Sequence, residues 1–146
     1  MMSALIGLGL AVFVAAFAHV VGFDRDRVFY PLVLIVIASY YDLFAVIGGS
    51  HADLTVDTVM FCLFAGAAVV GFRSSLWVVV AALALHGVFD LFHHSMIEGS
   101  GVPAWWPRFC LTYDFAAAAC LAVLLYRGAG LPYELRQTGR FNAWYL

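Results

Sequence analysis

The sequence predicts an all-α integral membrane protein, a compact bundle of five transmembrane helices. Hydrophobic residues make up 65% of the 146-residue chain and charged residues only 11%. Soluble domains carry about 25% charged residues, so the expected solvent is a membrane. Five separate stretches are apolar over about 20 residues, the length that spans a bilayer as a helix.

Composition also excludes one class of partner. The formal net charge is -2 and no basic patch is present, so we expect no nucleic-acid binding. The three cysteines form no CxxC pair, and they are interpreted as packing residues rather than as disulfides or metal ligands.

The first predicted helix covers residues 3–22. Its Ala16-Phe17-Ala18 segment is typical of a signal-peptidase site, but no Lys or Arg precedes the apolar run, as a signal peptide requires. We therefore expect a retained transmembrane helix. Ser3, Gly7, Ala11 and Ala15 repeat every four residues, a spacing of small residues that lets membrane helices approach closely.

Four further helices follow, and charged or glycine- and proline-containing breaks separate them. Asp24 to Arg27 precede the second helix, Gly48 to His51 the third, Gly71 to Ser75 the fourth and Glu98 to Pro103 the fifth. Pro103 suits the start of a helix. No internal repeat is evident, so residues 1–146 are taken as a single transmembrane domain. The predicted spans are 28–47, 54–72, 75–97 and 104–126.

Arginine placement predicts the orientation of the bundle. The side of the membrane opposite the N-terminus would carry six of the seven basic residues, all of which are arginines, and the N-terminal side only Arg108. By the positive-inside rule the N-terminus lies outside and the C-terminus is cytoplasmic, as expected in a bacterial plasma membrane. Trp105 and Trp106 would mark the outer interface.

The fourth span carries the residues that predict chemistry. Residues 86–94 read His-Gly-Val-Phe-Asp-Leu-Phe-His-His. At about 100° per residue, Asp90 and His93 fall within about 40° of His86, and His94 is the i+4 neighbour of Asp90. Ionisable groups inside a membrane usually face the bundle interior and mark an ion path, a proton relay or a metal.

Other spans place acids at a similar depth. On the predicted topology Asp42, Asp57 and Asp114 lie in the outer half of the membrane with the fourth-span cluster, whereas His19 lies near the opposite side. Asp57 is interpreted mainly as a residue of a helix start, where acids are favoured. His19 is interpreted as a hydrogen-bonding core residue.

The residue types suit a divalent transition metal, zinc or iron, as one ion or two. His86, Asp90, His93 and His94 are the predicted metal ligands, and Asp42 and Asp114 the predicted catalytic carboxylates from neighbouring helices. A carboxylate beside an imidazole could equally orient a ligand without touching the metal. The alternative without any ligand is a polar packing network.

Two families show a partial likeness. His86-x3-Asp90 and Asp90-x2-His93-His94 resemble shortened HxxxH and HxxHH histidine boxes of membrane desaturases and hydroxylases, which imply two irons. Those enzymes have three boxes, whereas this chain has one, with Asp90 in place of a histidine. The scatter of His and Asp over several helices is similar to intramembrane zinc amidases of the ceramidase type, whose serine motif is not evident here.

The leading functional hypothesis is a small metal-dependent intramembrane enzyme that acts on a lipid or other amphiphile, by hydrolysis or by oxidation. A proton- or cation-coupled transporter or channel using the same His/Asp cluster is the alternative, and it predicts a polar path across the whole bundle. A third hypothesis is an accessory subunit that docks on a second copy or a larger membrane complex through its small-residue helix faces.

Overall fold

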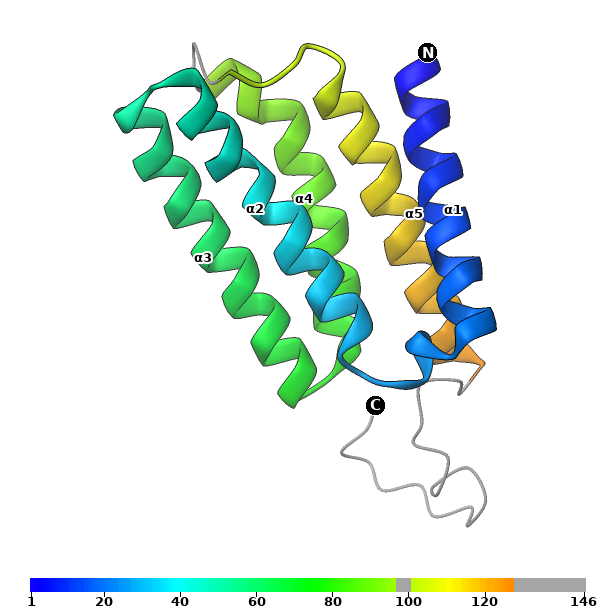
Figure 1. Ribbon diagram of the computed structural model, residues 1–146. Helices are drawn as coiled ribbons and strands as arrows, with labels where there is room; N and C mark the ends of the chain where they lie inside the picture. The colour runs from blue at the N-terminus through cyan, green and yellow to red at the C-terminus, as the bar shows by residue number, and fades with distance from the viewer. Residues whose placement is uncertain (97–100, 128–146) are drawn as a thin grey trace.

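The computed structural model describes residues 1–96 and 101–127, and for residues 94–96 it describes the backbone alone. This part of the chain folds into five α-helices and one short 3-10 helix, η1 (Figure 1). Each α-helix is long and apolar enough to cross a membrane. The elements are α1 Met2–Val21, η1 Phe23–Arg25, α2 Phe29–Gly48, α3 His51–Arg73, α4 Leu76–Met96 and α5 Trp106–Tyr126.

The helix boundaries lie within three residues of the predicted ones. The largest shift is at α3, which begins at His51 instead of residue 54. Ser50 explains it, because its side chain accepts a hydrogen bond from the Asp53 N–H at 3.2 Å and caps the helix. At α5 the structure places Pro107 in the first turn, where proline removes no helical hydrogen bond.

Short connections make consecutive helices run antiparallel. Gly22 (φ 90°) and Gly49 (φ 70°) end α1 and α2 in the left-handed conformation that glycine adopts without strain. The α2–α3 and α3–α4 connections take only two residues each. As a result the N-terminus, the α2–α3 turn and the start of α5 share one end of the bundle, which we call the N-terminal end (Figure 1).

The helices pack in a curved row rather than in a ring. Helix α2 packs mainly on α3, α4 packs on α5, and α1 packs on α5 at the edge of the row (Figure 1). Helix α4 also contacts α2 and α3, so it is the central helix of the bundle. Large apolar side chains such as Phe13, Val59 and Leu63 are exposed, as expected where lipid is the solvent.

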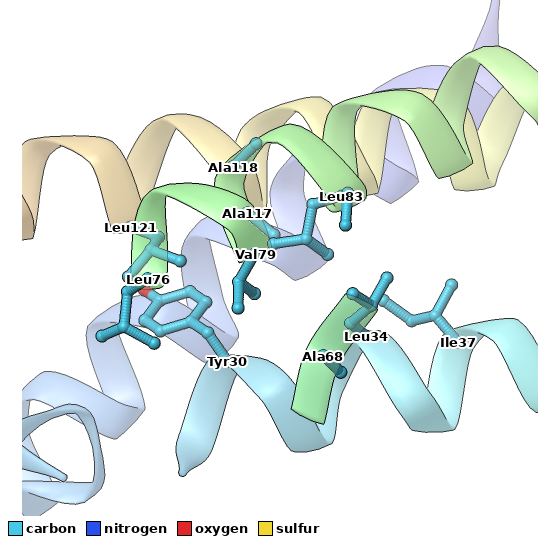
Figure 2. Packing of buried hydrophobic residues seen from close by; sticks show 11 residues of the cluster. Tyr30, Leu34, Ile37, Ala68, Leu76, Val79, Leu83, Ala117, Ala118 and Leu121 are labelled. Carbon is cyan, nitrogen blue, oxygen red and sulfur yellow. The ribbon is translucent and has the colours of Figure 1, made fainter. Parts of the chain in front are cut away.

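The apolar core fills the half of the bundle away from the N-terminal end. It is built from the first turns of α2 and α4 and the last turns of α3 and α5 (Figure 2). Leu34, Val79 and Leu83 are completely buried there. All members of the buried cluster are apolar, apart from the hydroxyl group of Tyr30. Among the described residues, apolar side chains therefore fill the interior of this half of the bundle.

Helix α1 touches α5 through the predicted small-residue face. A Cβ at Gly7 would collide with the Phe109 carbonyl oxygen and would lie 2.6 Å from Thr112 Oγ1. Thr112 Oγ1 also donates a hydrogen bond to the Ala4 carbonyl at 2.9 Å. The close partner of this face is thus a helix of the same chain.

Gly7→Ala should loosen α1 from α5, whereas Gly9→Ala should not. The added methyl at Gly7 meets backbone, which costs about 1–3 kcal/mol, while a Cβ at Gly9 meets nothing within 4 Å. Thermal denaturation in detergent should show a lower midpoint for Gly7→Ala and an unchanged or higher one for Gly9→Ala. Equal midpoints would contradict the α1–α5 packing.

Candidate functional site

Polar side chains from four helices meet in the other half of the bundle, nearer the N-terminal end. The residues that carry these side chains are all 2% exposed or less. Helix α4 supplies three of them at positions i, i+4 and i+7, the spacing of one helix face. We call this set the polar cluster: Tyr41 of α2, Asp57 of α3, His86, Asp90 and His93 of α4, and Asp114 of α5.

A glycine brings α5 close to this face of α4. A Cβ at Gly87 would lie 3.2 Å from the Asp114 Cβ and 3.3 Å from the Leu111 carbonyl oxygen. The absence of a side chain at Gly87 therefore lets Asp114 reach His86, the neighbouring residue on α4. Sequence and packing together place a carboxylate of one helix against an imidazole of the next.

The first group of the cluster joins one imidazole, two carboxylates and a phenol. His86 Nδ1 lies 2.7 Å from Asp114 Oδ2, a hydrogen bond, and 3.7 Å from Asp90 Oδ2. The Tyr41 hydroxyl donates to Asp90 Oδ1 at 2.5 Å. Three helices are thereby tied together through buried polar atoms, where hydrogen bonds are strong because the local dielectric constant is low.

The second group is a single His–Asp pair. His93 Nε2 lies 2.8 Å from Asp57 Oδ1, and both side chains are fully buried. The Tyr41 ring lies over the His93 ring with centroids 4.0 Å apart, and Phe89 meets the same imidazole edge-on at 5.4 Å. Tyr41 therefore links the two groups, by its hydroxyl to Asp90 and by its ring to His93.

Several buried atoms of the cluster have no hydrogen-bond partner among the residues that the structure describes. They are Asp57 Oδ2, Asp90 Oδ2, Asp114 Oδ1 and His93 Nδ1 when the carboxyl groups are ionised, whereas a proton shared by Asp90 and Asp114 would join these two in a hydrogen bond. A buried carboxylate oxygen without a partner costs free energy, so such atoms usually face a bound species. Among the described residues the arginine nearest to the cluster along the chain is Arg108, which is exposed and lies six residues before Asp114 on α5. With three carboxyl groups and two imidazoles, the cluster favours binding of a cation or of protons.

The ligand atoms of the first group suit a metal ion. One atom from each of His86, Asp90 and Asp114 lies within 4.8 Å of the other two. A tetrahedral ion with bonds of 2.0–2.1 Å separates its ligand atoms by about 3.3 Å. The distances from His86 Nδ1, 2.7 Å to Asp114 and 3.7 Å to Asp90, lie on either side of that value. Small shifts of side chains would therefore complete three protein ligands and leave a fourth position open.

The structure brings together some predicted residues and not others. His86, Asp90, His93 and Asp114 belong to the polar cluster. Asp42 is only half-buried, accepts a hydrogen bond from Thr58 at 2.9 Å, and lies outside both hydrogen-bonded groups. The His94 side chain lies outside the described residues.

Two residues of the cluster were not predicted as site residues. Asp57 does not belong to the start of α3, since Ser50 caps the helix and Asp57 lies in its second turn, facing α4. Ser50 was the feature of the sequence that could have placed the start of α3 well before Asp57, because serine commonly caps helices. Tyr41 is one of seven tyrosines in the chain, and no pattern in the sequence separates it from Tyr40 or Tyr113.

His19 lies away from this site. Its side chain is 69% exposed, and its Nδ1 is 2.8 Å from Asp24 Oδ2 in η1. The hydrogen bond agrees with the interpretation from sequence, but the exposed side chain shows that His19 is not a core residue.

Comparison of the chain with protein-family models, curated proteins and solved structures gives no match.

His93→Leu should destabilise the protein more than His93→Leu combined with Asp57→Leu. The single change leaves Asp57 buried without its partner, which costs about 3–5 kcal/mol, and the double change removes both polar groups. Unfolding titrations in mixed micelles measure the two free energies. His51→Leu is the matched control, because His51 is exposed and should change the free energy by no more than about 0.5 kcal/mol.

Equal destabilisation by the single and the double change would contradict coupling between the two side chains.

Proposed function

We propose that the chain is a small metal-dependent enzyme of a bacterial plasma membrane. Its five helices span the bilayer with the N-terminus outside and the C-terminus in the cytoplasm, as the arginine distribution indicates. The polar cluster then lies in the outer half of the membrane. Five apolar helices with exposed aliphatic side chains support the membrane part of this proposal.

The observation that carries the enzyme proposal is the convergence of three buried ligand atoms. His86, Asp90 and Asp114 come from two adjacent helices, are fully buried, and offer three atoms within 4.8 Å. Two carboxyl groups this close together in an apolar interior repel each other when ionised, and a divalent cation would neutralise both. In this proposal the first group holds a divalent transition metal, zinc or iron.

Hydrolysis of a lipid is favoured over oxidation. A single ion held by His86, Asp90 and Asp114 would supply hydrolytic chemistry, whereas the oxidative chemistry of the histidine-box enzymes needs two irons. Among the described residues, one group of three side chains has its ligand atoms close enough together to hold one ion. His93 and Asp57 already bond to each other, so they suit proton transfer better than a second ion.

The His93–Asp57 pair has the features of a general base. A carboxylate that accepts from Nε2 fixes the neutral imidazole with its proton on that nitrogen, which leaves Nδ1 free to take a proton. His93 Nδ1 has no partner among the described residues, as this role requires. Asp114 thus moves from the predicted role of base to that of ligand, and Asp42 has no role in this arrangement.

The transporter alternative has less support. It needs a polar path from the cluster to the cytoplasmic end, and the described residues in between form the apolar core (Figure 2). The accessory-subunit alternative relied on the small-residue face of α1, which packs on α5 of the same chain. Both observations favour the enzyme.

Metal content of detergent-purified protein tests the proposal. We expect about one zinc or iron ion per chain by elemental mass spectrometry, and loss of the ion in His86→Ala and Asp114→Asn. Tyr41→Phe removes only a hydrogen bond to Asp90 and should weaken binding by about 10–100-fold. His51→Ala should bind as the unaltered protein does.

Retention of the fold in each variant is checked by circular dichroism and gel filtration. Protein that contains no metal after purification without chelators, and takes up none on reloading with zinc or iron(II), would contradict the enzyme proposal. The polar cluster would then be a proton site or a packing network.

A further inference from the structure

A lateral groove runs between α2 on one side and α1 with α5 on the other. Its volume is about 700 Å³, within the range of small-molecule sites, about 300–1,000 Å³. Its walls combine aliphatic and aromatic side chains with a few polar tips. Resting on the proposed function, we infer that this groove binds the single apolar chain of the substrate, a long-chain acyl ester or amide, and presents its polar end to the polar cluster.

Neighbouring residues on α2 and α5 belong to the groove and to the polar cluster. On α2, Ile37 and Tyr40 line the groove, and the next residue, Tyr41, bonds to Asp90. On α5, Cys110 and Tyr113 line the groove directly before Asp114. None of the residues of the polar cluster lines the groove, and the groove residues next to the cluster along the chain are Tyr40 and Tyr113.

Cys110 has the smallest side chain of these groove residues. It is 3% exposed and lies within electrostatic range of both Asp90 and Asp114. The large side chains beside it, Tyr40, Phe109 and Tyr113, would block a polar group from reaching the cluster. Cys110 is therefore the groove residue whose small side chain lies near the carboxylates of the cluster.

Polar atoms are confined to one half of the groove. Tyr40, Trp106, Cys110 and Tyr113 bring hydroxyl, indole and thiol groups to the half nearer the polar cluster, and Trp106 Nε1 is buried without a partner among the described residues. Hydrocarbon side chains line the other half: Phe23, Phe29, Leu32, Val33 and Val36. This gradient matches an amphiphile with its polar end at the cluster.

The length of the groove fits one chain. The groove residues on α2 run from Phe29 to Tyr40, eleven steps of 1.5 Å or about 17 Å. That is roughly half of the ~30 Å hydrocarbon thickness of a bilayer, the length of one lipid chain. These residues are the first twelve of α2, so the methyl end of the chain would lie at the end of the bundle opposite the N-terminal end.

The reaction balances with water alone. The bond between the acyl carbon and its oxygen or nitrogen breaks, the acyl carbon gains the water oxygen, and the leaving alcohol or amine takes up a proton. In this proposal His93 Nδ1, which has no partner among the described residues, would accept the proton that water releases. No oxidant or reductant is involved.

Photo-crosslinking tests where the chain lies and how it is oriented. Two long-chain fatty acids serve as probes, one with a diazirine beside the carboxyl group and one with a diazirine at the methyl end. We expect the first to label residues between Trp106 and Tyr113, and the second to label residues between Phe23 and Val33. Mass spectrometry of the cross-linked peptides identifies the sites.

A matched pair of variants separates the groove from the general lipid surface. Val36→Trp fills the groove and should lower labelling about tenfold, while Val59→Trp, on the exposed face of α3, should not. Even labelling of all five helices, the reverse orientation, or cross-links to a second copy of the chain would overturn the inference.

The same samples distinguish this inference from the proposed function. Labelling of the groove in protein that binds no metal would leave the binding site standing and remove the enzyme. Metal binding without groove labelling would keep the metal site and overturn the groove as the site for the chain.

Discussion

The burial of three carboxyl groups in an apolar bundle is the constraint on which the rest of the structure depends. Asp57, Asp90 and Asp114 are at most 1% exposed, in surroundings where lipid cannot solvate them. Each is held by a partner from another helix: His93, Tyr41 and His86. These contacts fix α2, α3 and α5 against α4, because removing one partner would leave a costly unpaired group.

The bundle is consequently divided into two halves with different tasks. The half away from the N-terminal end is a packed apolar core. The half nearer the N-terminal end contains buried polar atoms in place of that apolar packing, and some of these atoms lack hydrogen-bond partners among the described residues. Gly87 and Gly7 let α5 approach α4 and α1 closely, so that Asp114 and the walls of the lateral groove are held by the same helix. Site and groove are thus parts of one arrangement.

Helical periodicity and hydropathy predicted all five helices and the three inward-facing residues of α4, because both depend on local sequence. Asp57 was misjudged, since its role depends on where α3 begins, and the Ser50 cap moves that start by a turn. Asp42 and Asp114 looked equivalent in depth. They differ in how their helices are rotated about the helix axis, and a sequence alone does not determine that rotation. Tyr41 could not be distinguished from Tyr40 for the same reason.

X-ray absorption spectroscopy at the metal edge is the most direct test of the central claim, that buried carboxylates and an imidazole form a metal centre. The account predicts a first shell of nitrogen and oxygen at about 2.0–2.2 Å, with outer scattering from imidazole. A sulfur shell at about 2.3 Å would mean that a cysteine holds the metal. That result, or a shell of water oxygens without imidazole scattering, would contradict the assignment of His86, Asp90 and Asp114.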